Sequence, residues 1–319
     1  MLVEVGIFLL GLVALSWSAD KFVFAASALA NNMGISPMVI GLTIVAMGSS
    51  APEIVVAAVA SLAGNTDTAV GNALGSNITN IALVLGLTVL VKPILVRSTT
   101  VRREMPILLL VSVLAAYFIF DDMLERIEGV LLITMFFVVL GGLAWISMGI
   151  EQDDPLEGET ADEIPVNVAT SKAVMWLLVG LLLLPLSAHF MVESAVNIAH
   201  YLGLSELVIG LTIIAIGTSL PELAACIAGV LKGEDDLVLG NIIGSNIFNL
   251  LAVLAMPGLI APGSIDPSAA GRDTLVMLGL TLLLMVFSFN LRGSRCINRW
   301  QGGVFLGCFM LYQYVVLFA

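Results

Sequence analysis

The sequence predicts an all-α membrane protein with ten transmembrane helices, arranged as two inverted repeats of five helices. Three observations carry this prediction: the composition, the spacing of apolar runs and an internal repeat. Of the 319 residues, 59% are hydrophobic and only 11% are charged, whereas soluble domains are about a quarter charged. A chain of this composition belongs in a lipid bilayer.

The apolar runs are long enough to cross a membrane, because a spanning helix needs roughly 20 mostly apolar residues. We expect ten spans, near residues 2–30, 38–63, 69–91, 104–121, 128–150, 172–200, 207–231, 237–260, 272–291 and 302–318. The first run carries Glu4 and lacks a basic leading segment, so it is expected to be a retained span and not a signal peptide.

The basic residues between the spans predict the orientation. Most of them fall on one side of the membrane: Lys92, Arg97, Arg102, Arg103, Lys172, Lys232, Arg292, Arg295 and Arg299. Only Arg126 and Arg272 fall on the other side, and Lys21 lies within the first span. Since cytoplasmic loops are enriched in Lys and Arg, both termini are expected to face outward.

The chain repeats itself at a constant offset of 169 residues. Gly41–Glu53, "GLTIVAMGSSAPE", matches Gly210–Glu222, "GLTIIAIGTSLPE". Gly71–Asn80, "GNALGSNITN", matches Gly240–Asn249, "GNIIGSNIFN". One offset over most of each half indicates duplication. We divide the chain into a first repeat, 1–150, an acidic cytoplasmic linker, 151–171, and a second repeat, 172–319.

Five spans per repeat is an odd number, so the second repeat must enter the membrane from the opposite side. Inverted repeats with interrupted helices are typical of secondary transporters, which bind their substrate near the middle of the bilayer. The segment between the repeats is strongly acidic: Glu151–Pro165 holds seven acidic residues and no basic one. This composition is typical of a solvent-exposed linker.

Each copy of the repeated phrase places a glutamate after a proline within an apolar run: Pro52–Glu53 and Pro221–Glu222. An ionisable side chain at the bilayer centre costs at least ~2.5 kcal/mol, so it usually lines a pathway or binds a partner. Proline breaks the helical hydrogen bonds and frees carbonyl oxygens. Irregular backbone at this depth is tolerated only when it is buried in protein or lines a cavity.

Polar residues at helical spacing accompany the two glutamates, since residues three and four apart share a helix face. Ser49 and Ser50 precede Glu53, and Thr218 and Ser219 precede Glu222. The following spans each carry an Asn-Ser-Asn stripe at intervals of four: Asn72, Ser76 and Asn80, then Asn241, Ser245 and Asn249. The predicted site holds only oxygen ligands, which favours sodium, calcium, magnesium or manganese over zinc or copper.

Several other functions are excluded. The chain has no basic patch, so nucleic acid is not an expected partner. Cys226, Cys296 and Cys308 form no metal or redox pattern. An intramembrane hydrolase using Ser49 or Ser50 lacks a nearby His or Lys to activate the serine. The chain is therefore not expected to be an enzyme, to need a cofactor or to have an obligate protein partner beyond the lipid bilayer.

The paired phrases "GSSAPE" and "GTSLPE", with the two "GN-x-x-GSNI-x-N" stretches, resemble the repeats of the calcium/cation antiporter superfamily, the sodium/calcium exchangers. The opening "SADKFVFAAS", the length and the acidic central loop are most similar to the bacterial inner-membrane calcium/sodium antiporter branch. The resemblance covers the whole chain. It implies a multi-pass protein of the bacterial inner membrane, with both termini in the periplasm.

The resemblance also implies a set of ion ligands. Glu53 and Glu222 would be shared by calcium and sodium. The remaining ligands would be hydroxyl, amide or backbone carbonyl oxygens of Ser49, Ser50, Thr218, Ser219, Ser76, Ser245, Asn80, Asn249, Ala46 and Ala215. Potassium-dependent relatives carry Asp at one of the two positions held here by Asn80 and Asn249, so potassium co-transport is not expected.

The expected function is exchange of sodium for calcium by alternating access at a midplane carboxylate site. Two alternatives stay open. In a calcium/proton antiporter the same glutamates would carry protons, and dependence of calcium flux on a sodium gradient at clamped pH separates the two. A channel of similar fold would show simple conductance in place of saturable counterflow.

Overall fold

The structure is a computed structural model that describes residues 1–35, 37–148, 168–201, 215–289 and 295–318. These residues are mostly helical and form two compact units. The first unit comprises Met1–Ser49 with Leu140–Asn241, and the second comprises Ser50–Val139 with Ile242–Ala319. Each unit therefore combines segments from both halves of the sequence.

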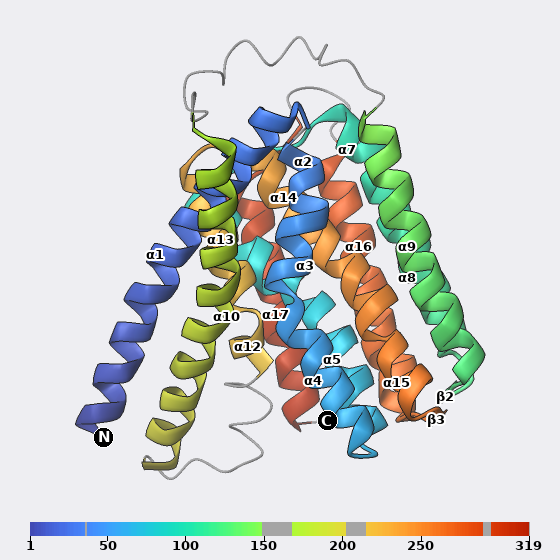
Figure 1. The fold of residues 1–319 in the computed structure, drawn as a ribbon. Coiled ribbons are helices and arrows are strands. Elements are labelled where there is room, and N and C mark those ends of the chain that lie inside the picture. The colour runs from blue at the N-terminus through green and yellow to red at the C-terminus, as the bar shows by residue number, and fades with distance from the viewer. Residues whose placement is uncertain (36, 149–167, 202–214, 290–294, 319) are drawn as a thin grey trace. The chain divides into compact units, whose positions relative to one another are not determined.

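The first unit is built around two long helices, α1 (Leu2–Met33) and α10 (Thr170–Tyr201), which lie side by side (Figure 1). Phe22 of α1 is fully buried, and a Cβ at Gly180 of α10 would lie 2.6 Å from the Phe22 Cβ. The other helices are α2 (Pro37–Ile40), η1 (Gly41–Val45), α3 (Ala46–Ser49), α12 (Ala215–Thr218), α13 (Leu220–Leu231) and the first half of α14 (Asp235–Phe248).

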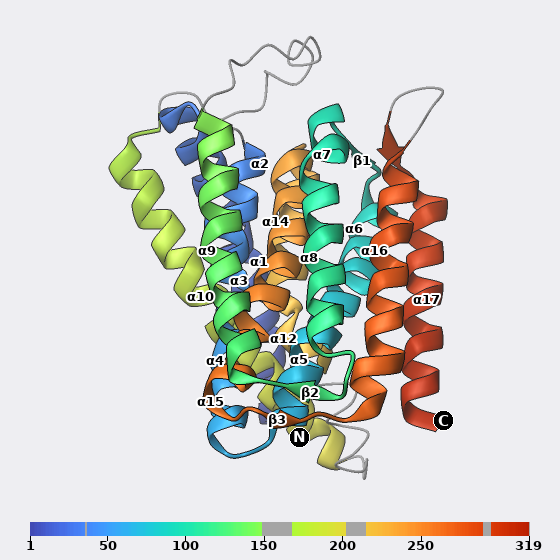
Figure 2. The same ribbon diagram turned by 90° about the vertical axis from the view of Figure 1, so that its right-hand side faces the viewer.

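The second unit holds most of the remaining helices: α4 (Ala51–Leu62), α5 (Thr66–Thr79), η2 (Asn80–Leu85), α6 (Gly86–Val91), α7 (Ser98–Arg102), α8 (Glu104–Phe118), α9 (Arg126–Met148), η4 (Asn249–Val253), α15 (Ala255–Ile260), η5 (Ala269–Asp273), α16 (Thr274–Ser288) and α17 (Arg299–Phe318). In Figure 2, α8, α16 and α17 run side by side. The last residues of α9 belong to the first unit.

Two short antiparallel ribbons join connecting segments of the second unit. β1 (Ile94–Leu95) pairs with β4 (Cys296–Ile297), and β2 (Met123–Leu124) pairs with β3 (Gly263–Ser264). Each ribbon links a connection in the first half of the sequence to one in the second half. The ribbons therefore fix the ends of helices that are distant in sequence.

Six described helices are long and apolar enough to cross a membrane, and a seventh span results if the helices on either side of Ser50 are counted together. The six are Leu2–Met33, Thr66–Val91, Arg126–Leu143, Thr170–Met191, Asp235–Ile260 and Ala269–Ser288. Several spans of this kind make the chain a multi-pass membrane protein. Part of the predicted 207–231 span and most of the predicted linker lie outside the described residues, so the count of ten stays a prediction.

The helix bounds follow the 169-residue offset of the sequence repeat. Elements that match in both bounds are α3 with α12, α4 with α13, α5 with α14 and α6 with α15. The π-helices η2 and η4 begin at the matching residues Asn80 and Asn249. The repeat seen in the sequence is therefore also present in the helix bounds. That the two repeats cross the membrane in opposite directions stays a prediction.

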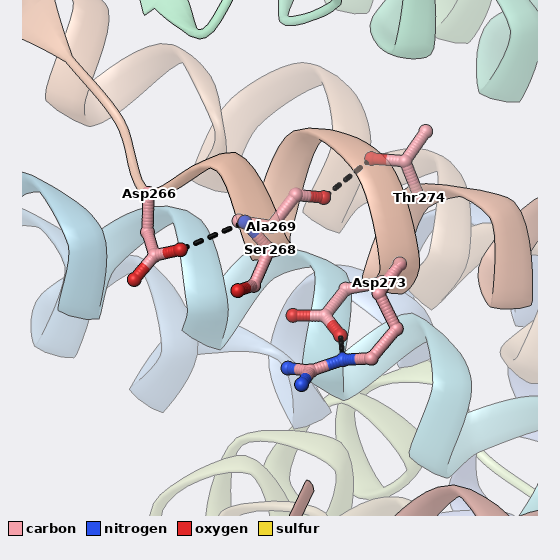
Figure 3. Close-up of polar contacts among 6 residues, drawn as sticks. Asp266, Ser268, Ala269, Asp273 and Thr274 are labelled. Atoms are coloured by element: carbon pink, nitrogen blue, oxygen red, sulfur yellow. Dashed lines mark hydrogen bonds and ion pairs between the residues drawn. The ribbon is translucent and has the colours of Figure 1, made fainter. Parts of the chain in front are cut away.

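The start of the η5–α16 helix is held by polar contacts at its N-terminal end (Figure 3). The Asp266 carboxylate accepts a hydrogen bond from the Ser268 backbone N–H at 2.7 Å, and this bond lowers the Asp266 pKa. The Thr274 hydroxyl donates to the Ala269 carbonyl at 2.8 Å, and the Arg272 Nε donates to Asp273 at 2.7 Å. The first of these bonds pairs a backbone N–H group at the helix start.

Candidate functional site

Both copies of the repeated phrase interrupt their helix at the same place. One helix ends at Ser49 and another begins at Ala51, while in the second copy the break falls between Thr218 and Leu220. The residues at the two breaks have nearly the same backbone angles, φ −90° and ψ 10° at Ser50, and φ −91° and ψ 6° at Ser219. The predicted interruption is confirmed, and no continuous helix face joins Ser49 to Glu53.

The breaks explain how proline is accommodated. Pro52 and Pro221 are each the second residue of the new helix, α4 or α13. A proline in the first turn removes an N–H group that has no partner within the helix anyway. Backbone groups that a continuous helix would have paired are thus released next to the glutamates.

Glu53 and Glu222 lie in the first turn of α4 and α13, and both are buried, with exposed fractions of 0% and 1%. A carboxylate in the first turn of a helix is stabilised by the positive end of the helix dipole. Glu53 belongs to the second unit and Glu222 to the first. Each compact unit therefore holds one buried carboxylate at the start of a broken helix.

In the second unit, the predicted ligands lie on packed helices. The π-helix η4, which begins at Asn249, contacts both α4, which carries Glu53, and α5, which carries Ser76. Asn80 follows directly on α5 at the start of η2. Ser50, Ser76, Asn80, Ser245 and Asn249 are all buried. The fold thus places elements from both halves of the sequence around the helix that carries Glu53.

Three of these buried side chains have polar atoms without a protein partner. Among the described residues, the Ser245 hydroxyl and both amide atoms of Asn80 and of Asn249 have no hydrogen-bond partner. Burying an amide or hydroxyl without a partner costs at least about 1–3 kcal/mol. These residues are therefore suited to bind a ligand that the chain itself does not supply, and π-helical turns are frequent at such sites.

In the first unit, the Ser49 side chain is hydrogen-bonded to a residue of α14. Its hydroxyl donates to the Asn241 side-chain oxygen at 3.2 Å and lies 3.4 Å from the Ala46 carbonyl, while the Asn241 amide group donates to the Cys226 sulfur at 3.4 Å. This network is buried. Ala46 starts α3, so its carbonyl lies one turn before the Ser49 hydroxyl.

The other predicted ligands of the first unit surround the second break. Ala215 and Thr218 are the first and last residues of α12, and Thr218 is half-buried. Ser219 is buried, and its hydroxyl has no hydrogen-bond partner within the described part of the chain. It is thus a further oxygen available at the break.

A close helix crossing places Asn241 beside Ser49. Gly41 of η1 and Gly240 of α14 face each other, and a Cβ at Gly240 would lie 2.4 Å from the Met38 carbonyl oxygen. Gly71 matches Gly240 in the first repeat, and no atom of the described residues lies within 4 Å of a Cβ at Gly71. The Gly240 position therefore requires glycine for packing, and the Gly71 position does not.

The ligand prediction omits two asparagines that support the site. Asn241 bonds to Ser49, and the Asn72 amide donates to the Glu53 backbone carbonyl at 3.1 Å. Both belong to the polar stripes seen in the sequence. Their spacing gives no sign that they bind protein atoms, because a stripe shows only that a helix face is polar.

The chemistry of these residues matches a hard cation. The candidate ligands are carboxylate, hydroxyl, amide and carbonyl oxygens, which suit sodium, calcium or magnesium. No group of three or more His, Cys, Asp or Glu side chains that could hold a metal gathers among the described residues.

The sequence model of the family described as "Sodium/calcium exchanger protein" matches residues 3–145 and 172–318. The chain belongs to the sodium/calcium exchanger family. The resemblance predicted from the paired motifs is thereby confirmed. The family is one of membrane transporters, and the two matched ranges leave out residues 1–2, 146–171 and 319.

Relatives in the family match along the whole chain. The Alkalimonas amylolytica protein named "Putative antiporter CaxA" is 55% identical over 316 residues, which cover 99% of each chain. The inner membrane protein YrbG of Escherichia coli (strain K12) is 44% identical, over 98% of this chain and 96% of its own. A solved structure of the sodium-calcium exchanger NCX_Mj, soaked with 2.5 mM Na⁺ and 10 mM Sr²⁺, is 33% identical and superposes with a TM-score of 0.84, covering 100% of this chain and 99% of its own.

Proposed function

We propose that the chain is a secondary active antiporter that exchanges sodium for calcium across the bacterial inner membrane. It would work by alternating access at a carboxylate site near the middle of the bilayer. The proposal includes ten helices in two inverted repeats, 1–150 and 172–319, with both termini in the periplasm. Membership of the sodium/calcium exchanger family and the similarity to the inner membrane protein YrbG support it.

The observation that carries the proposal is the duplicated broken helix with a buried glutamate in its first turn. Alongside it, both amide groups at the start of η2 and η4 are buried and have no partner among the described residues. A buried carboxylate is expensive unless a cation or hydrogen bonds compensate for its charge. A cation bound by both carboxylates would neutralise their charges and would also give the amide oxygens of Asn80 and Asn249 a binding partner.

The proposed ligands are those of the sequence prediction. Glu53 and Glu222 are shared by both ions. Oxygens of the remaining residues complete the calcium and sodium positions: Ser49, Ser50, Thr218, Ser219, Ser76, Ser245, Asn80, Asn249, Ala46 and Ala215. The Asn80 and Asn249 side chains, being neutral, add ligands without adding charge.

Coupling follows from charge balance. Two ionised glutamates carry a charge of −2, which either one Ca²⁺ or two Na⁺ neutralise. An empty site would leave a charge of −2 with no cation to balance it when the protein occludes the site, and burying charge in this way costs several kcal/mol per ion. The loaded forms can therefore cross between the two access states, whereas the empty form is held back. This restriction makes the movement of one ion depend on the other.

The second candidate is exchange of calcium for protons. A carboxyl group that is buried in a membrane protein can bind a proton in place of a metal ion, because burial disfavours its charged form. The calcium site would then be unchanged, and only the driving ion would differ. The family description and the NCX_Mj neighbour favour sodium.

Calcium flux in proteoliposomes tests the proposal, with the sodium and proton gradients imposed separately. We expect calcium uptake into sodium-loaded vesicles at clamped pH, saturable in calcium and dependent on the sodium gradient. An imposed proton gradient without sodium should give no uptake above that of empty vesicles. Uptake driven by the proton gradient alone would favour the proton antiporter, and calcium conductance without counterflow would indicate a channel.

A further inference from the structure

A cavity of about 410 Å³ lies in the first unit, away from the carboxylate face of α13. Its wall is formed by residues of α1, α10 and α13: Leu12, Leu15, Ser16, Asp20, Met191, Leu220, Leu223, Ala224, Ile227, Ala228, Leu231 and Lys232. The volume is within the ~300–1,000 Å³ of small-molecule pockets. Except for Ser16, Asp20 and Lys232, the lining is apolar.

The α13 residues that line the cavity recur at helical spacing, from Leu220 through Leu223 and Ile227 to Leu231. Glu222 is not among them, because it lies about 160° around the helix from Leu220 at 3.6 residues per turn. The cavity is therefore separate from the proposed ion site.

Charged groups gather at one end of the cavity. The Lys232 ammonium lies 2.7 Å from one Asp20 oxygen, and the Lys21 ammonium lies 3.3 Å from the other. These two ammonium groups and one carboxylate together carry a net charge of +1. The Lys232 and Lys21 side chains are still 32% and 36% exposed, so both can bind a further anion.

The sequence repeat does not extend to this charged end. At the 169-residue offset, Lys232 corresponds to Ala63, and Asp20 and Lys21 correspond to His189 and Phe190. The cavity wall also differs, since Ala224 and Ala228 correspond to the bulkier Val55 and Val59. A feature present in only one repeat serves a role other than the duplicated ion site.

The dimensions identify the kind of ligand. The α13 segment from Leu220 to Lys232 is about 18 Å long at 1.5 Å per residue. One leaflet of the hydrocarbon core is about 15 Å thick, half of the ~30 Å total. A cavity that is apolar over the depth of one leaflet and cationic at one end is complementary to an acyl chain that carries an anionic head group.

We propose that this cavity binds one anionic phospholipid of the bilayer. One acyl chain occupies the apolar part, against Ala224, Ala228 and Met191. The phosphate is bound by the ammonium groups of Lys232 and Lys21, in the manner of basic pockets between transmembrane helices that bind lipid head groups. Since Asp20 already orients both lysines, the lipid head group would join an existing charge cluster.

Native mass spectrometry of the full chain tests this proposal. The protein is released from nanodiscs that contain equal amounts of phosphatidylglycerol and phosphatidylcholine. We expect one phosphatidylglycerol molecule to stay bound, at several times the occupancy of phosphatidylcholine. Equal retention of the two lipids, or retention of only a fatty acid or detergent, would overturn the proposal.

Two variants with matched controls locate the site. Lys232→Gln should lower phosphatidylglycerol retention at least about fivefold, whereas Lys172→Gln, which removes an exposed charge from α10 outside the cavity lining, should not. Ala228→Phe fills the cavity and should abolish retention, whereas Val59→Phe, at the matching exposed position of α4, should not. Equal retention by Lys232→Gln and Lys172→Gln would contradict the assigned head-group site, even if Ala228→Phe failed to fold. The readout does not depend on ion transport.

Discussion

Substitution of Glu53→Gln is expected to abolish sodium-dependent calcium uptake, and Glu222→Gln is expected to do the same. Glutamine keeps the size and the polar atoms of the side chain but removes one of the two charges that would balance Ca²⁺. At a buried position such as these, truncating one partner of a charge pair costs about 3–5 kcal/mol. A loss of this size in binding corresponds to a fall of at least ~100-fold in affinity.

The measurement is calcium uptake into sodium-loaded proteoliposomes with equal amounts of inserted protein. Glu125→Gln is the matched control, because Glu125 is an exposed carboxylate in the same unit as Glu53. Its uptake should equal that of the wild type. Near wild-type rates in either buried variant would refute the assignment of the two glutamates.

Gly240→Ala is expected to destabilise the protein, since its Cβ would lie 2.4 Å from the backbone oxygen of Met38. Backbone cannot rotate away as a side chain can, so α14 or α2 must shift. Overpacking of this kind costs about 1–3 kcal/mol. The shift would also move Asn241 away from Ser49 and reduce transport. The change should be visible as a lower midpoint of thermal unfolding in detergent.

The repeat supplies the control for this prediction. Gly71→Ala is the equivalent substitution in α5, where the part of the chain that the structure describes places no atom within 4 Å of the new Cβ. Alanine is favoured over glycine within a helix by up to about 1 kcal/mol, so Gly71→Ala should leave the midpoint unchanged or raise it. Equal losses of stability in the two variants would contradict the close crossing of Gly41 and Gly240.

Much of the fold could be predicted from the sequence, because a feature that occurs at matching positions of both repeats is predicted twice, independently. The matching phrases at Glu53 and Glu222 predict two interrupted helices, and both breaks occur at the expected residues. Proline supplies a reason, since it has no N–H group and is tolerated best in the first turn of a helix, which is where Pro52 and Pro221 lie. The burial of the polar stripes follows from the cost of exposing amides to lipid.

Contacts between distant segments could not be predicted from the sequence. The compact units join segments from both halves, although the sequence divides most simply at the acidic linker. Asp20 lies next to Lys21 in the sequence, but in the structure it also forms an ion pair with Lys232. Spacing along one helix shows which residues share a face, and only the packing of α1 against α13 shows which helix covers that face.

Equilibrium binding of ⁴⁵Ca²⁺ to the purified protein, titrated with sodium at constant pH and ionic strength, tests the central claim most directly. If one pair of carboxylates serves both ions, sodium should displace calcium completely, and choline should not. The Hill coefficient for sodium should exceed 1, because two monovalent ions are needed to replace one divalent ion. Calcium that stays bound at saturating sodium would contradict the shared site.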